Sequence, residues 1–228
     1  MKTAARKNAT VMEAQFANRY EGGQFLAERL SHLANNREVV VLALPRGGVP
    51  VGYEIAKKLN APLDVFIVRK LGLPFHEELA MGAIASGGIQ VLNLDVIRQL
   101  QISSGILEAT AAAEQRELER RERAYRRGRN PLGIAGRTVI VVDDGLATGA
   151  SMSAAVRALH GKDPARIIVA VPVGAAETCD RLNSEADELI CGIKPNPFGA
   201  IGLWYKDFTQ TTDAEVCELL DRLAPPGR

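Results

Sequence analysis

The sequence predicts an α/β fold in which a parallel sheet is flanked by helices. Short runs of Val, Ile and Leu, bounded by Gly, Pro or Asp, alternate along the chain with longer helical patterns, as in βαβ units. The runs are continuous rather than alternating with polar residues, which is typical of strands buried on both faces. The chain has 228 residues, of which 46% are hydrophobic, enough for one well-buried domain.

Five segments have the composition of core strands, and three helices are predicted to follow them. The predicted strands are Val39 to Leu44, Leu63 to Val68, Thr138 to Val142, Arg166 to Pro172 and Glu188 to Cys191. The predicted helices are Gly52 to Leu59, Ser151 to His160 and Ala175 to Glu185. We therefore expect residues 1–228 to form a single domain whose core spans about 37–192.

A different kind of segment separates the second and third predicted strands. Met81 to Ser86 and Gly88 to Leu92 are predicted to form a hairpin that turns at Gly87-Gly88. Ser103 to Arg127 then has the pattern of one long helix, an insertion at about 103–127. Charges of alternating sign along this helix favour a solvated face over a partner surface.

Composition excludes several classes of function. Lys and Arg total 28 against 27 Asp and Glu, a net charge of +1, so no global field attracts nucleic acid or an anionic membrane. No run reaches the ~20 apolar residues that cross a bilayer, and the basic segment Met1 to Thr10 lacks an apolar stretch behind it. We expect a cytoplasmic protein. Cys179, Cys191 and Cys217 fit no zinc spacing and are predicted to be buried free thiols.

The segment Val139 to Ser151 combines an apolar strand, two adjacent acids, a loop of small residues and a helix start. Ligands of open α/β sheets bind beyond the carboxyl ends of strands, where this loop lies. Its small residues let the backbone approach an anion, the helix amides point at that anion, and Thr148 and Ser151 add hydroxyl groups. It is neither a triphosphate P-loop nor a dinucleotide fingerprint. Acids beside a phosphate cradle suit a sugar diol and Mg²⁺, so the expected ligand is a sugar phosphate.

This segment resembles the signature with which type I phosphoribosyltransferases bind 5-phosphoribosyl diphosphate (PRPP). The chain as a whole is similar to a subgroup of small bacterial members with Leu-Pro-Arg-Gly-Gly and Asp-Asp-Gly-Leu-Ala-Thr-Gly segments, and the resemblance covers roughly Val39 to Cys191. It implies a type I core with a flexible lid and hairpin, and a small hood from about 194–210 plus the N-terminal region. It also implies that the ribose and 5′-phosphate contact Asp143, Asp144, Gly145, Leu146, Ala147, Thr148, Gly149, Ala150 and Ser151.

Two upstream segments resemble further parts of that family. Pro45-Arg46-Gly47-Gly48 resembles the diphosphate loop, in which a glycine turn exposes amides beside an Arg fork, so Arg46, Gly47 and Gly48 are expected to bind diphosphate. Arg69 and Lys70 stand where the family has a basic pair and a closing lid. Within that lid, Glu77 or Glu78 would contact Mg²⁺ or a substrate amine, with surface carboxylates as the favoured alternative.

The reaction implied is displacement of diphosphate from the anomeric carbon of PRPP by an acceptor, through an oxocarbenium-like transition state. Arg69, Lys70, Asp143 and Asp144 are the expected catalytic residues, and Mg²⁺, near Asp144 and carried by PRPP, is the expected cofactor. A homodimer is expected from the resemblance. Two alternatives stay open: a PRPP-sensing or nucleotide-sensing module without turnover, against which Arg69 and Lys70 count, and a ribose-phosphate hydrolase or phosphorylase.

The acceptor is expected to be nucleobase-like and is not identified. Ala147 stands where enzymes acting on 6-oxopurines carry an acid, which argues against hypoxanthine or guanine. The loop Leu146 to Gly149 resembles that of uracil enzymes, but those have Pro at the position of Asp144 and a C-terminal Gly-Asp segment that this chain lacks. Phe198 and Trp204 are candidates for stacking on a base, although packing of a small subdomain explains these aromatics equally well.

Overall fold

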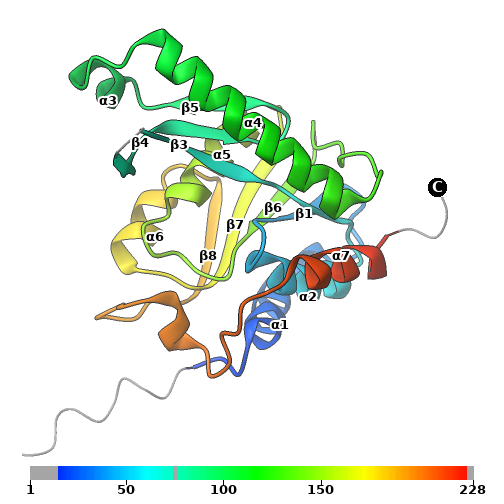
Figure 1. Cartoon of the computed structure of the whole chain (residues 1–228). Helices are drawn as coiled ribbons and strands as arrows, with labels where there is room; N and C mark the ends of the chain where they lie inside the picture. Colours follow the sequence, from blue (N-terminus) through cyan, green and yellow to red (C-terminus); the bar gives the residue numbers. More distant parts are fainter. Residues whose placement is uncertain (1–14, 74–75, 225–228) are drawn as a thin grey trace, which may run out of the picture.

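The computed structural model describes residues 15–73 and 76–224, and the side chains of residues 76–79 lie outside the description. Its centre is a five-stranded sheet in the order β2-β1-β6-β7-β8, with every neighbouring pair parallel (Figure 1). The predicted α/β class is confirmed. The strands are β1 (Val39–Ala43), β2 (Leu63–Val65), β6 (Thr138–Val142), β7 (Arg166–Val173) and β8 (Glu188–Ile193).

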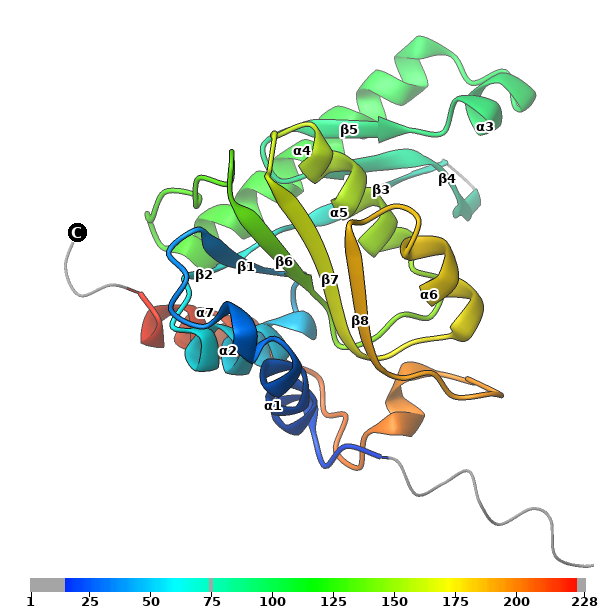
Figure 2. The ribbon, with the colours of Figure 1, turned by 180° about the vertical axis from the view of Figure 1, so that it is seen from behind.

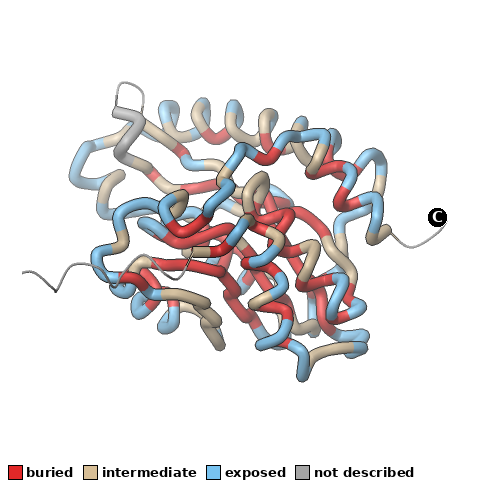
Figure 3. The backbone as a smooth tube through the Cα atoms, turned by 90° about the horizontal axis from the view of Figure 1, so that it is seen from below, coloured by how far each residue is buried: buried red, intermediate tan, exposed pale blue. Residues whose placement is uncertain are grey.

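Helices cover both faces of this sheet (Figure 2). On one face, α1 (Arg19–Arg29) and α2 (Gly48–Leu59) pack against Val39 and Val41 of β1. On the other face, α5 (Ala150–His160) and α6 (Ala176–Leu182) pack on a cluster that contains Val40 and Leu42. Burial of every β1 residue explains why the strand is apolar throughout, and buried residues gather in the central strands in Figure 3.

Strand order places a topological switch point between β1 and β6. The chain leaves β1 through α2 and returns at β2 on one side, whereas β6 is followed by β7 and β8 on the other side. Connections that diverge in this way leave a crevice at the carboxyl ends of the two strands. The predicted diphosphate loop and the predicted cradle loop both begin there.

The predicted second strand, Leu63 to Val68, contains β2 and only the first residue of a further strand, β3, which was not predicted. β2 ends at Val65, and β3 (Val68–Leu73) belongs to a separate antiparallel sheet with β4 (His76–Ala85) and β5 (Ile89–Leu92). Phe66 and Ile67 join the sheets and are both buried, so the apolar run continues across the boundary and hides it. The predicted hairpin is confirmed, and it turns through Gly87 and Gly88 at positive φ.

The predicted long helix is also confirmed as α4 (Ser104–Arg126), but it is not only a solvated helix. Ala111, Leu118 and Tyr125 form a buried stripe that packs on β3, β4 and the C-terminal helix α7 (Asp213–Arg222). The end of α4 is fixed to β2, because Arg126 Nε donates to Asp64 Oδ1 at 3.0 Å with both side chains buried. In Figure 1 this helix runs along the outside of the antiparallel sheet.

The remaining elements differ from prediction mainly at their ends. Helix α2 begins at Gly48 rather than at the predicted Gly52. The prediction began too late because the glycine and proline of the first turn have the composition of a loop. Helix α6 is shorter than Ala175 to Glu185. The elements without a predicted range are α1, α3 (Leu94–Gln99), α7 and two 3-10 turns, η1 (Ser31–Leu33) and η2 (Ile201–Trp204).

The expected hood is present as a small apolar cluster of its own. Trp204, Tyr205 and Phe16 are buried together with Val173. Phe16 and Tyr205 form an isolated parallel bridge, which joins the segment before α1 to the segment after η2. The hood and the N-terminal region therefore form one unit beside the carboxyl end of the sheet.

Candidate substrate-binding crevice

The loops that follow β1 and β6 lie directly against each other. A Cβ atom on Gly47 would overlap the Asp144 carboxylate, and one on Gly48 would lie 2.6 Å from the Val142 carbonyl oxygen. A residue larger than glycine would push the loops apart at both positions. The peptide bond between Pro45 and Arg46 is cis. The two predicted ligand loops are thus brought together at the switch point.

The cradle loop presents the start of α5 to the crevice. Gly149 adopts φ +68° at the N-cap, and no side chain caps the helix. Two loop carbonyls are held by α6, since Thr178 Oγ1 donates to Ala147 O at 2.7 Å and Arg181 Nη2 donates to Thr148 O at 2.5 Å. With carbonyl oxygens bound on one side, the uncapped helix amides are the groups free to meet an anion.

The two acids behind this loop are unequal, since Asp144 is buried and Asp143 is half-buried. Asp144 accepts a hydrogen bond from Arg19 Nε at 2.8 Å, and its own amide donates to Asp143 Oδ1 at 2.8 Å. Burial, with the neighbouring Asp144 charge, raises the pKa of Asp143 well above its ordinary value. Burial also raises the pKa of Asp144, although the Arg19 guanidinium opposes that shift.

Two residues of this site, Arg19 and Tyr205, were not predicted from the sequence. Arg19 reaches Asp144 across 125 positions of sequence, and the Tyr205 hydroxyl donates to the Asp144 carbonyl oxygen at 2.6 Å. Both come from regions expected to form the hood, but neither stands in a motif. A lone Arg before a helical pattern and a Tyr in an aromatic-rich loop carry no local signal for this contact.

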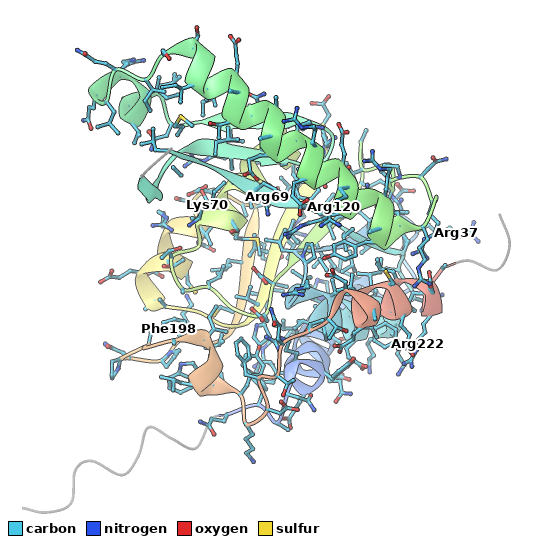
Figure 4. All side chains as sticks on the ribbon, viewed as in Figure 1. Arg37, Arg69, Lys70, Arg120, Phe198 and Arg222 are labelled. Atoms are coloured by element: carbon cyan, nitrogen blue, oxygen red, sulfur yellow. The ribbon has the colours of Figure 1, made fainter. Side chains whose placement is uncertain are left out.

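The structure separates the predicted basic pair. Successive side chains of a strand point to opposite faces, so Arg69 and Lys70 of β3 diverge (Figure 4). Arg69 Nε donates to Glu114 Oε2 of α4 at 2.5 Å, whereas Lys70 lines a cavity together with Thr148 and Ser151. The expectation that both cations serve one site is therefore corrected: Lys70 faces the cradle and Arg69 braces the α4 side.

The cavity beside the cradle has a volume of about 760 Å³. It lies between the antiparallel sheet and α5, and its polar lining includes Lys70, Thr148, Ser151, Arg157 and Arg181. Asp95 and Glu185 line it as well, and Glu185 pairs with Arg157 and Arg181, so Lys70 and the helix amides are the groups that we expect an anion to meet. Arg46, the predicted diphosphate ligand, lies elsewhere in the crevice and has its Nη1 atom 3.8 Å from Asp213 Oδ1.

The arrangement of Phe198 and Trp204 favours the packing alternative over stacking on a base. Trp204 is buried and its Nε1 donates to the Phe198 carbonyl oxygen at 2.9 Å, so its ring belongs to the hood core and is not free to stack on an acceptor. Phe198 is half-buried against the same cluster. Among the hood aromatics, the Tyr205 hydroxyl contacts Asp144 directly, and the centre of the Phe208 ring lies 3.9 Å from the Arg19 guanidinium carbon.

The presumed lid stays a prediction. The side chains of His76, Glu77 and Glu78 lie outside the described residues.

The thiols are free as predicted, with Cys179 and Cys217 buried and Cys191 half-buried. In the described part of the chain, no helix is long and apolar enough to cross a membrane.

The donor set does not fit a Mg²⁺ ion held by the protein. No three His, Cys, Asp or Glu side chains of the described residues gather as metal ligands. Asp144, the predicted metal contact, already has one carboxylate oxygen bound by Arg19. Mg²⁺ prefers several oxygen ligands in octahedral geometry, so a Mg²⁺ site at Asp144 would need most of its oxygens from the ligand and water.

Comparison with known proteins identifies the family. The family model described as "Phosphoribosyl transferase domain" matches residues 75–205, which include the acid pair and the cradle loop; Arg46, Arg69 and Lys70 precede the match. The structure of the protein TT1426 from Thermus thermophilus superposes with a TM-score of 0.82 and 41% identity, covering 92% of this chain and 100% of that one.

A curated Mycobacterium tuberculosis protein named "Putative phosphoribosyl transferase" is 47% identical over 209 residues, in two strains. The alignment covers 91% of this chain and 46% of the relative, so the chain spans about half the length of the curated relatives it matches. With a family model over more than half of its residues and a full-length structural relative, the chain belongs to the phosphoribosyl transferase domain family.

Proposed function

We propose that this protein transfers the 5-phosphoribosyl group of PRPP to a nucleobase-like acceptor and releases diphosphate. The observation that carries the proposal is the meeting of two loops at the switch point, where the close approach of Gly47 to Asp144 joins a diphosphate loop to a ribose-phosphate cradle. PRPP carries a 5′-phosphate and a diphosphate on opposite sides of one ribose. A crevice with both loops in contact suits that ligand.

Each part of the crevice has a defined task in this proposal. The amides at the start of α5, with Thr148 and Ser151, hold the 5′-phosphate, and Asp143 and Asp144 accept hydrogen bonds from the ribose hydroxyls. Arg46 and the amides of Gly47 and Gly48 receive the diphosphate. Mg²⁺ belongs to the substrate here, as the counter-ion of its diphosphate.

Catalysis would come from the separation of charge as the anomeric bond breaks. Positive charge grows on the ribose beside the buried acids, and negative charge grows on the departing diphosphate near Arg46. Lys70 is the further cation that we assign to the phosphate groups, since Arg69 is paired with Glu114. The acceptor nucleophile forms the new anomeric bond as the bond to diphosphate breaks, and no covalent enzyme intermediate is required.

A sensing module without turnover is the second candidate, and one observation favours it. Two of the predicted diphosphate cations have carboxylate partners, Arg46 with Asp213 and Arg69 with Glu114. A binding-only module tolerates such neutralisation better than an enzyme that must stabilise a leaving group. We also propose a homodimer, from the family resemblance, which light scattering of the purified protein would test. We propose a cytoplasmic location from the sequence, which cell fractionation would test.

Calorimetric titration with PRPP and Mg²⁺ tests the proposed site. The wild type should bind, and Asp143→Asn/Asp144→Asn should lose most of that affinity, whereas Asp221→Asn on the exposed face of α7 should retain it. No binding by the wild type, or equal binding by the double variant, would contradict the proposal. Release of diphosphate in an acceptor screen would then identify a transferase, release with water alone a hydrolase, and binding without release a sensor.

A further inference from the structure

Arg19 is the most constrained cation of the crevice. Its Nε donates to Asp144 Oδ2 at 2.8 Å, its Nη1 donates to the Thr209 carbonyl oxygen at 2.8 Å, and its guanidinium lies 3.9 Å from the centre of the Phe208 ring. Phe208 in turn stacks on Tyr205 at 5.2 Å. Arg19 is 9% exposed. The planar group is therefore fixed on three sides by contacts that leave it little freedom to turn away from Asp144.

Asp144 connects this cation to both ligand loops. Its carboxylate abuts Gly47 of the diphosphate loop, and its amide donates to Asp143. Its carbonyl oxygen accepts from the Tyr205 hydroxyl, which belongs to the hood. A change in the position or charge of Asp144 would therefore reach the ribose acids and the diphosphate loop together.

The charge of Asp144 depends on one partner. Among the described residues, the titratable or charged groups that face it are Arg19, Asp143 and Tyr205. Burial raises the pKa of Asp144, and Arg19 lowers it by its hydrogen bond and its charge. The pKa of Tyr205 is raised by burial, so this phenol stays neutral. Arg19 is thus the group that opposes the effect of burial on the pKa of Asp144.

We infer that Arg19 is a positioning residue of the ribose site: its hydrogen bond holds the Asp144 carboxylate seated against the diphosphate loop, so that the first helix and the hood complete the core crevice. This inference rests on the proposed function, because it assigns Arg19 a role in PRPP binding. The competing explanation is a structural clasp that only fastens α1 to the sheet. The two differ in the pH dependence of the affinity for PRPP, since with a clasp that affinity does not follow the protonation of Asp144.

The test measures the affinity for PRPP and Mg²⁺ between about pH 6 and pH 9 in the wild type, Arg19→Lys and Arg19→Met. Arg29→Met is the matched control: Arg29 lies on the same helix with its guanidinium 3.5 Å from the Phe25 ring, but it has no contact with the acids. Running the wild type in parallel cancels the titration of PRPP itself. If Arg19 contributed only its positive charge to the crevice, its removal would weaken the affinity for PRPP equally at every pH.

We expect Arg19→Met to weaken binding by about tenfold or more near pH 6.5, with a smaller difference at pH 9, because removal of Arg19 raises the pKa of Asp144 further and a higher pH favours the carboxylate. Arg19→Lys should lie between, because an ammonium supplies the charge without the fixed geometry. Arg29→Met should follow the wild type. Wild-type affinity and pH profile in a folded Arg19 variant, or a loss independent of pH, would overturn the inference.

A second measurement keeps the inference separate from the proposed function. Carboxyl NMR titration, with the Asp144 signal assigned through Asp144→Asn, should show Asp144 titrating at higher pH in Arg19→Lys than in the wild type, with no ligand present. An unchanged Asp144 titration would refute the role of Arg19 directly. Absence of PRPP binding by the wild type, together with the shifted titration, would instead remove the proposed function and leave the electrostatic link between Arg19 and Asp144.

Discussion

The core loops and the accessory elements build the crevice by different means. The loops after β1 and β6 are positioned by close packing at glycines, whereas α1 and α7 are joined by ion pairs to residues of the crevice, and α4 is joined by one to the strand that carries Lys70. The exposure of these ion pairs increases from the pair of α1 to that of α4 and then to that of α7. The two side chains are 10% and 12% exposed in Arg19–Asp144, 27% and 25% in Arg69–Glu114, and 36% and 67% in Arg46–Asp213.

This gradient indicates how strongly each accessory element is coupled to the site. Ion pairs gain strength as solvent is excluded, and exposed pairs are worth little. Backbone contacts between the core loops should therefore matter most, then the buried pair of α1, then the half-buried pair of α4, and last the exposed pair of α7. Changes at each level test that ranking.

The largest effect is expected at the contact between the core loops. Gly47→Ala would place a methyl group on the Asp144 carboxylate and separate the two halves of the crevice. Displacement of substrate-positioning groups by about 1 Å costs on the order of a hundredfold, so affinity for PRPP should fall by that order. Gly161→Ala is the control, because its Cβ would have only an ordinary contact at 3.5 Å. Titration of both variants with PRPP and Mg²⁺ measures the difference, and wild-type affinity in Gly47→Ala would show that the loops need not touch.

The acid pair should show a conflict between stability and function. The pKa of Asp143 is raised in the folded state, so folding favours its protonated form and stability falls as pH rises above its ordinary value near 4. Asp143→Asn retains an oxygen for the Asp144 amide without the buried charge. We expect this variant to be more stable than the wild type by about 1–3 kcal/mol at pH 8, with a smaller gain near pH 4.5. Urea unfolding at both pH values measures this, and a variant less stable than the wild type at pH 8 would contradict the assignment of a buried, charge-disfavouring site.

The two basic residues of β3 should differ in effect. Lys70→Met removes a cation that lines the cavity beside the cradle and should weaken PRPP binding by about tenfold. Arg69→Met should change affinity by less than about threefold, since Arg69 is occupied by Glu114. Titration of both variants at one pH gives the comparison. Equal losses would mean that Arg69 leaves Glu114 when PRPP binds.

The smallest effect is expected at the exposed pair of α7. Asp213→Asn removes the carboxylate charge beside Arg46 but keeps an oxygen for the Tyr125 hydroxyl, which donates to Asp213 at 2.7 Å. Affinity for diphosphate should rise by about twofold to threefold at low salt, and the gain should disappear at high salt because an exposed pair is screened. A gain that persists at high salt would place this pair in a more buried environment than the structure shows.

The predictable parts of the molecule are those encoded by local patterns. The strands around Val139 and Val41 are continuous apolar runs, and the Asp143 to Ser151 loop carries its own motif, so the core, the switch-point loops and the family followed from sequence. Arg19 and Tyr205 did not, because their link to Asp144 is a tertiary contact between distant segments without a motif. The divergence of Arg69 and Lys70 follows from strand alternation once β3 is known to begin at Val68, but the apolar run hid that boundary.

The central claim is that the crevice between β1 and β6 binds PRPP, and a crystal structure with PRPP and Mg²⁺ tests it most directly. We expect the 5′-phosphate on the amides at the start of α5, the ribose hydroxyls toward Asp143 and Asp144, and the diphosphate beside Arg46 and Gly47. PRPP bound elsewhere, or an empty crevice in crystals saturated with PRPP and Mg²⁺, would contradict it.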